Sequence, residues 1–242
     1  MSLSSRVAPR TRSRIGAVAA SLLLLPTLAA CSGDSDGPDD AAPEEVLAQA
    51  AEELTETSGI ELSLTTDDLP QDVTGITKAE GTATHAPAFE GDIAVVISGQ
   101  QVDVPVVAVD DLVYAQLPFT DGWNEVDPAE YGAPDPAGLI DPDDGFPALL
   151  GCTVDPEKGQ SVRGGAGNTE ILTTYSGTVR GEDMKKVIPS ASGDIFTVEW
   201  QVTEDGQLRR ADLTGVFYAG SDEMTYTVTF NDYGVEKDIA AP

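Results

Sequence analysis

The sequence predicts an antiparallel α+β domain, and three patterns lead to that prediction. Short runs of alternating apolar and polar residues recur between residues 60 and 230, as expected of β-strands with one buried face. Tight turn signals such as Asp110-Asp111 and Glu204-Asp205-Gly206 join neighbouring runs directly. There is one long helical pattern, near the start of the domain. One long helix, a few short ones and roughly nine strands of five or more residues, besides two runs of four, with short connections favour an antiparallel sheet.

The first 30 residues are interpreted as a secretory signal and not as part of the fold. Residues 6–14 hold four arginines, residues 15–25 form an apolar run, and small residues follow. The apolar run is too short to span a membrane as a helix. Leu28-Ala29-Ala30-Cys31 resembles a bacterial lipobox, in which the cysteine sulfur receives a diacylglyceryl group before cleavage. The alternative is an ordinary signal peptide that happens to precede a cysteine.

Cys31 is therefore the expected lipid anchor. Two acyl chains hold a protein stably where one binds only marginally, so the mature chain is expected on the outer face of the cytoplasmic membrane. Residues 31–43 are rich in Ser, Gly, Pro and Asp and predict a flexible tether. Residues 44–242 form the single predicted domain. Cys152 is left unpaired, and we interpret it as a small buried residue and not as a nucleophile.

The predicted elements follow the chain in order. Pro43 before two glutamates is typical of a helix start, and this helix is expected to reach about residue 57, with Gly59 as its stop signal. Pro128, Pro136 and Pro142 are each spaced to open a short helix. A further short helix is expected near residues 182–188. Strands are expected at 60–64, 76–85, 89–97, 102–109, 112–117, 123–126, 160–163, 169–179, 195–203, 207–218 and 224–230.

Residues 89–117 hold much of the densest Val and Ile and are the best candidate for the core. Along 89–97 the apolar residues recur at every second position and so share one strand face. Residues 102–109 and 112–117 are apolar at neighbouring positions as well, so both of their faces need a cover. What supplies that cover is the question that connects the fold with function.

Charge and residue content disfavour several classes of function. The net charge is −29, and removing the four arginines of the signal leaves −33. Such an excess repels nucleic acids and anionic lipid head groups. His85 is the only histidine, so no histidine-based triad or zinc cluster can be assembled. Asp141, Asp143 and Asp144 resemble half of a calcium loop without its spacing or closing glutamate. We predict no enzyme, no metal and no cofactor.

Several stretches carry a resemblance to a known family. They are residues 110–117, Gly122-Trp123, the Asp-Pro run 139–145, and Trp200 followed by residues 204–208. In their order and spacing, from about residue 44 to residue 237, the chain resembles the LppX/LprAFG family of actinobacterial cell-envelope lipoproteins. The resemblance implies a strongly curved antiparallel sheet, a half-barrel, with helices packed on its concave face around an apolar cavity.

The resemblance also implies a ligand and a function. Family members hold the acyl chains of envelope lipids such as triacylglycerols and acylated phosphatidylinositol glycolipids, so we expect a carrier of such lipids between envelope layers, with a lipid exporter as a further partner. The alternative is an envelope lipoprotein with a filled core that acts as an assembly or interaction module. Apolar strand faces would line the cavity. The expected lining residues are Ile93, Val95, Ile97, Val104, Val106 and Tyr114.

Overall fold

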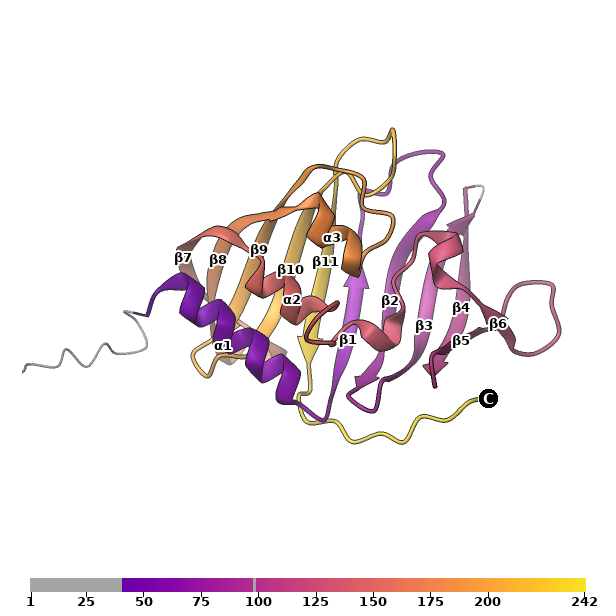
Figure 1. The fold of residues 1–242 in the computed structure, drawn as a ribbon, viewed down its shortest axis with the longest axis horizontal. Helices are drawn as coiled ribbons and strands as arrows, with labels where there is room; N and C mark the ends of the chain where they lie inside the picture. Colours follow the sequence, from indigo (N-terminus) through magenta and orange to yellow (C-terminus); the bar gives the residue numbers. More distant parts are fainter. Residues whose placement is uncertain (1–40, 98) are drawn as a thin grey trace, which may run out of the picture. The chain divides into compact units, whose positions relative to one another are not determined.

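A computed structural model describes residues 41–97 and 99–242. The predicted secretory signal (1–30), the anchor at Cys31 and most of the tether (31–43) lie outside the described residues. In the described part, one α+β domain contains an antiparallel sheet of 11 strands. The sheet carries helices on one of its faces (Figure 1).

The strands form two meanders that meet in the middle of the sheet. Their spatial order is β6-β5-β4-β3-β2-β1-β11-β10-β9-β8-β7, so β1 pairs with both β2 and β11. The strands are β1 (Gly59–Thr65), β2 (Gly75–Thr84), β3 (Ala88–Ile97), β4 (Gln100–Val109), β5 (Leu112–Ala115), β6 (Asn124–Val126), β7 (Val154–Gly164), β8 (Glu170–Arg180), β9 (Ile195–Thr203), β10 (Leu208–Gly215) and β11 (Met224–Asn231).

The two faces of the sheet differ sharply in chemistry. Residues that stand opposite each other on neighbouring strands point to the same face. One face therefore carries Leu62, Phe230, Ala211 and Trp200, all buried. The other face carries polar pairs such as Ser63 and Thr229, whose hydroxyls lie 2.7 Å apart. We call these the inner and outer faces; the inner face is the one that the helices cover.

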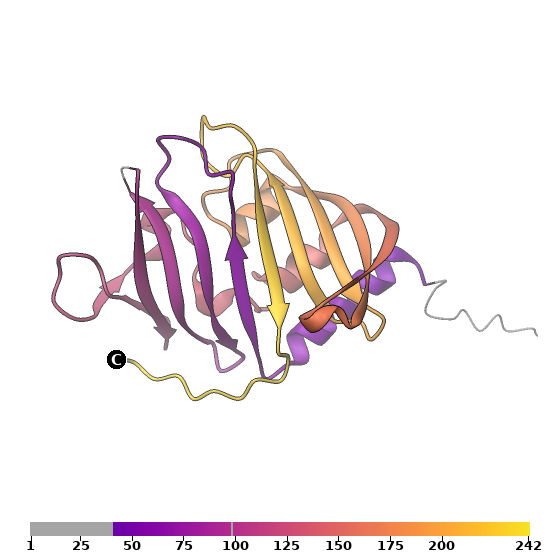
Figure 2. The same cartoon turned by 180° about the vertical axis from the view of Figure 1, so that it is seen from behind.

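Three α-helices and two short 3-10 helices cover the inner face (Figures 1 and 2). They are α1 (Pro43–Glu56), α2 (Phe146–Gly151), α3 (Gly181–Val187), η1 (Pro128–Tyr131) and η2 (Pro136–Gly138); a third 3-10 helix, η3 (Ala166–Asn168), lies between β7 and β8. The helix α1 buries Leu47 and Leu54 in the core. Each buried leucine contributes about 1.5–3 kcal/mol relative to an exposed one.

The end of α1 differs from the prediction. Gly59 is the first residue of β1 and does not end the helix in a left-handed conformation; the C-cap is Thr57, in extended backbone. A Cβ on Gly59 would lie 2.6 Å from the carbonyl oxygen of Val235, so glycine is needed there for close packing of the C-terminal segment. His85 also has a structural role, because its Nε2 lies 3.1 Å from the carbonyl oxygen of Leu54 in the last turn of α1.

The proline- and aspartate-rich run is organised by its own side chains. Asp127 and Asp135 each accept a hydrogen bond from the backbone two residues ahead and so cap η1 and η2, where a proline follows as predicted. Pro142 opens a turn and not a helix. The Asp141 carboxylate accepts hydrogen bonds from the amides of Asp143 and Asp144, at 2.8 and 3.1 Å. Hydrogen bonds to the backbone thus account for Asp127, Asp135 and Asp141 in this run.

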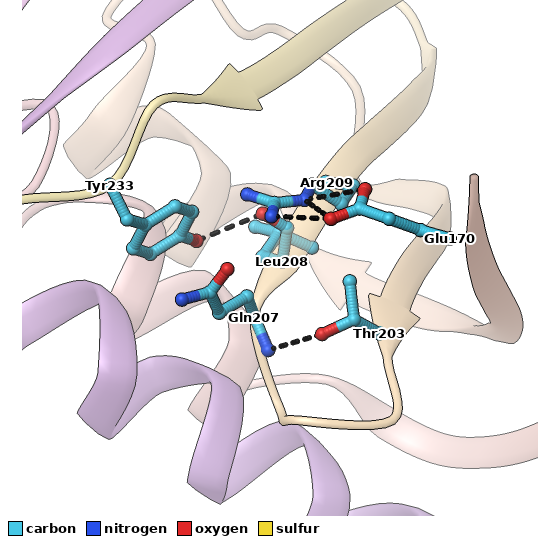
Figure 3. Close-up of polar contacts among 6 residues, drawn as sticks. All are labelled: Glu170, Thr203, Gln207, Leu208, Arg209 and Tyr233. Atoms are coloured by element: carbon cyan, nitrogen blue, oxygen red, sulfur yellow. Dashed lines mark hydrogen bonds and ion pairs between the residues drawn. The ribbon is translucent and has the colours of Figure 1, made fainter. Parts of the chain in front are cut away.

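The hairpin between β9 and β10 closes on a compact polar cluster (Figure 3). Arg209 lies at a register shift in β10, and its guanidinium donates to both carboxylate oxygens of Glu170, with the shortest distance 2.7 Å. The guanidinium carbon also lies 5.3 Å from the centre of the Tyr233 ring. The Tyr233 hydroxyl donates to the carbonyl of Leu208 at 2.9 Å. These contacts tie β8, β10 and the chain after β11 together.

Candidate functional site

An apolar pocket lies between the inner face and its covering segments. Its walls come from β1, β2, β3 and β11, from residues 132–139, from α2 and from the connections after α3 and β10. Its volume is about 70 Å³. An engineered apolar cavity of about 150 Å³ binds benzene, so the pocket as it stands has room for only a few methylene groups.

Aromatic side chains set the walls of the pocket. The ring of Phe146, the first residue of α2, packs edge-on against Phe230 with centroids 5.1 Å apart and so places the helix over β11. Phe217 bridges Phe196 and Tyr226, with centroid distances of 4.9 Å to each. Because offset and edge-to-face ring pairs favour defined geometries, these contacts fix the wall that β11 and the β10–β11 connection provide.

A pair of glycines shapes the sheet beneath the pocket. Gly81 on β2 stands opposite Gly91 on β3, and neither carries a side chain on the inner face. The ring of Phe89 fills this space: a Cβ built on Gly81 would lie 2.5 Å from its Cζ atom, and one on Gly91 would lie 2.7 Å from it. Phe89 itself lines the pocket and is 2% exposed. The glycine pair therefore determines how far the Phe89 ring projects into the pocket.

Two tyrosines supply hydroxyls to this apolar surrounding. Tyr218, after β10, and Tyr226, on β11, both line the pocket, and their hydroxyl oxygens lie 2.8 Å apart. The Tyr226 hydroxyl also donates to the carbonyl of Ile76 at 3.0 Å. Burial, followed by the proximity of Tyr218, raises the pKa of Tyr226 far above its usual range, so its phenol keeps its proton.

Of the six residues expected to line a cavity, Ile93 lines this pocket. Val104 stands opposite Ile93 and Val106 opposite Gly91, so both belong to the inner face. They are 7% and 5% exposed and belong to the main core, and their strand β4 contacts η2. Their position agrees with a place beside the pocket, but they are not among its lining residues.

The other three residues lie in different surroundings. Val95 and Ile97 continue the inner-face series of β3 toward the β3–β4 turn, where Ile97 is 45% exposed. Tyr114 stands opposite Val107 and therefore points to the outer face, away from Ile93 and Val104. Their contact with a ligand stays a prediction.

Most of the pocket wall comes from residues that the sequence did not single out. The largest contribution is from the centre of the sheet and its covering loops: Leu62, Leu64, Ile76, Phe89, Leu139, Phe146, Tyr218, Tyr226 and Val228. The alternation of β11, in which every second residue from Met224 to Phe230 is buried, was a usable signal. What no pattern revealed is that β11 pairs with β1.

The described residues offer little other chemistry. Within 41–97 and 99–242, no group of three or more His, Cys, Asp or Glu is placed to hold a metal ion. Cys152 is a free, half-buried cysteine next to α2. In the same part of the chain, no helix is both long and apolar enough to cross a membrane.

Comparison with known proteins agrees with this fold. Residues 42–239 match the family model described as LppX_LprAFG lipoprotein. The lipoarabinomannan carrier protein LprG of Mycolicibacterium hassiacum is 27% identical over 93% of this chain and 96% of its own. LprG of Mycobacterium tuberculosis is 26% identical over 83% of this chain and 85% of its own.

Solved structures show the same architecture. LprF from Mycobacterium bovis superposes with a TM-score of 0.67 at 15% identity, over 83% of this chain and 96% of that protein. LppX from Mycobacterium tuberculosis gives a TM-score of 0.59 at 16% identity, over 82% of this chain and 98% of that protein. With a family match that spans nearly the whole described domain, the chain belongs to the LppX/LprAFG family of non-enzymatic lipoproteins and is distantly related to LprG.

Proposed function

We propose that this protein is a lipid carrier of the cell envelope that binds the acyl chains of lipids in the pocket between the inner face and its covering segments. The observation that carries the proposal is the pocket itself, an apolar space lined largely by residues that pack in or against the hydrophobic core. Burial of acyl methylenes contributes about 0.8 kcal/mol each, so binding needs no charged contact. The strong negative charge of the chain is compatible with such a ligand.

The pocket must widen to hold a whole acyl chain, because about 70 Å³ is too little. Residues 132–139 are the part of the cover best suited to move, since they contain one 3-10 helix of three residues and no α-helix. In the proposed loaded form the segment separates from β2 and β3, and the sheet curls into the half-barrel that the family resemblance implies. Triacylglycerols and phosphatidylinositol glycolipids are the proposed classes of cargo.

Anchoring through Cys31 completes the proposed mechanism. A diacylglyceryl group on Cys31 would hold the domain at the outer face of the cytoplasmic membrane, and the tether that follows would let the domain reach lipid there. Transfer to a second envelope layer or to an exporter would then proceed without catalysis.

The test is extraction of lipid from the full-length chain carrying Cys31→Ser, which removes acyl chains of the anchor from the measurement. Mass spectrometry is expected to find stoichiometric acylated lipid, and the protein is expected to accept labelled lipid from vesicles. Ile93→Trp, which fills the pocket, should lower loading. Val162→Trp, an exposed position on β7 at the far end of the sheet and outside the pocket, should leave loading unchanged.

A second function, that of an interaction module with a filled core, is favoured by the small volume of the pocket. It predicts that neither bound lipid nor uptake from vesicles is found, and that result would contradict the carrier proposal.

A further inference from the structure

The two tyrosine hydroxyls in the pocket form a hydrogen-bonded chain that ends on a backbone carbonyl. Tyr218 Oη lies 2.8 Å from Tyr226 Oη, which in turn lies 3.0 Å from the carbonyl oxygen of Ile76. Tyr218 is half-buried and belongs to the β10–β11 connection, at the same end of the sheet as the β1–β2 connection (Figures 1 and 2). Both tyrosines and Ile76 line the pocket.

The direction of this chain follows from the number of protons. A phenol has one proton to donate, and a carbonyl can only accept. The bond from Tyr226 to Ile76 therefore uses the only proton of Tyr226. The bond between the two hydroxyls must then use the proton of Tyr218. Tyr218 Oη is left with acceptor capacity and with no proton for a ligand.

The opposite direction is disfavoured by burial. Tyr226 is 3% exposed. For Tyr218 to donate to a ligand, it would have to release Tyr226, which would leave a lone pair of a buried hydroxyl without a donor. If Tyr226 donated to Tyr218 instead, the carbonyl oxygen of Ile76 would lose its hydrogen-bond donor in the same apolar surroundings. Unpaired polar groups in an apolar interior are costly, so the chain stays oriented toward Ile76.

We propose that Tyr218 makes the pocket select acylated lipids that carry a free hydroxyl, such as diacylglycerols, over fully esterified triacylglycerols. This inference rests on the proposed lipid-carrier function and narrows its ligand class: of the two cargo classes proposed above, it favours the hydroxyl-bearing glycolipids over the triacylglycerols. A free hydroxyl donates to Tyr218 Oη, whereas the ester oxygens of a triacylglycerol are acceptors and meet another acceptor there. A site that pairs a ligand hydroxyl rejects the analogue without it, because its own polar group is left unpaired.

The experiment is a competition for loading. The full chain carrying Cys31→Ser is incubated with phosphatidylcholine vesicles that contain equal amounts of dioleoylglycerol and trioleoylglycerol, then separated, extracted and analysed by mass spectrometry. The expected preference for dioleoylglycerol is about tenfold, which corresponds to about 1.4 kcal/mol, as expected for one polar contact.

Three tyrosine variants show whether the preference comes from this chain of hydrogen bonds. Tyr218→Phe removes the acceptor and should bring the ratio to about one. Tyr226→Phe frees the proton of Tyr218 for an ester oxygen and should raise loading of trioleoylglycerol. Tyr233→Phe removes a hydroxyl that donates to Leu208, outside the pocket, and should keep the wild-type ratio.

The outcomes separate this inference from the proposed function. Equal loading of both lipids by the wild type, or a ratio that survives Tyr218→Phe, overturns the selection by Tyr218 and leaves the carrier proposal standing. Failure to load either lipid overturns the selection by Tyr218, and it overturns the carrier proposal as well if no lipid is extracted from the protein as isolated.

Discussion

Gly81→Ala tests the shape of the pocket floor. The new Cβ would lie 2.5 Å from the carbonyl oxygen of Glu90, 2.5 Å from Cζ of Phe89 and 2.8 Å from Cα of Gly91. Two of these three atoms belong to the backbone of β3, so the strand pair must separate or the Phe89 ring must move. Overpacking of this kind costs about 1–3 kcal/mol. The ring can move only toward the pocket or toward neighbouring core, so lipid loading should fall as well.

The assay compares Gly81→Ala with Gly138→Ala in denaturant and thermal unfolding. A Cβ on Gly138 has no neighbour within 4 Å, and the backbone there is not left-handed, so the expected change is within about 0.5 kcal/mol. For a domain of this size, each kcal/mol lowers the melting temperature by about 2–4 °C. If Gly81→Ala is as stable and loads as much lipid as Gly138→Ala, the account of the glycine pair and Phe89 is wrong.

Three further predictions concern the anchor, the closing hairpin and the response to acid. Cys31→Ser should release the protein from membranes, as fractionation would show; retention in the membrane fraction would contradict lipidation. Arg209→Ala should lower the free energy of unfolding by about 1–3 kcal/mol, because it leaves Glu170 without its bidentate partner. The site is partly buried, with the Glu170 side chain 29% exposed and the Arg209 side chain 16% exposed. A change under about 0.5 kcal/mol in urea unfolding would refute this. The hydrogen bond from Lys186, with the charges of Lys186 and Arg180, holds the pKa of Asp183 below its ordinary range. A pKa that is lower in the folded state than in the unfolded state stabilises the fold above the unfolded pKa, and this stabilisation is lost as the pH falls through the folded pKa. The difference in unfolding free energy between wild type and Asp183→Asn should therefore be constant from neutral pH down to about pH 4 and should shrink below it. A difference that stays constant down to about pH 2 would contradict this.

Periodicity predicted most strands well because one face of the sheet is buried and the other is polar. The strand at 195–203 has the predicted bounds, and β1, β2, β3 and β11 differ by one or two residues. The strand β7 was predicted as 160–163 but runs over Val154–Gly164. It lies at the end of the sheet, and nearly all its residues are exposed, so no alternation of burial marks its first half.

The pocket was harder to predict than the fold, because its walls depend on which strands are neighbours. Residues 102–109 and 112–117 were expected to be covered on both faces, and the inner-face residue Val106 is buried in the main core. On the outer face Val107 is 6% exposed, opposite Tyr114. Tyr114 was assigned to the same lining as Ile93, but register places the two on opposite faces, and register cannot be read from residues that are apolar at every position.

The junction of the two meanders has a consequence for how the chain folds. The meander of β1–β6 and that of β7–β11 each consist of strands paired with near neighbours in sequence. Among the strands of the described residues, the only pairing between the two meanders is β1 with β11, from Glu61↔Asn231 to Thr65↔Thr227. These partners are about 160 to 170 residues apart in the chain, so their meeting carries a large loop-closure entropy and is expected late in folding. Since the pocket has walls from both sides of this junction, it cannot exist in either meander alone, and ligand uptake becomes a property of the completed fold.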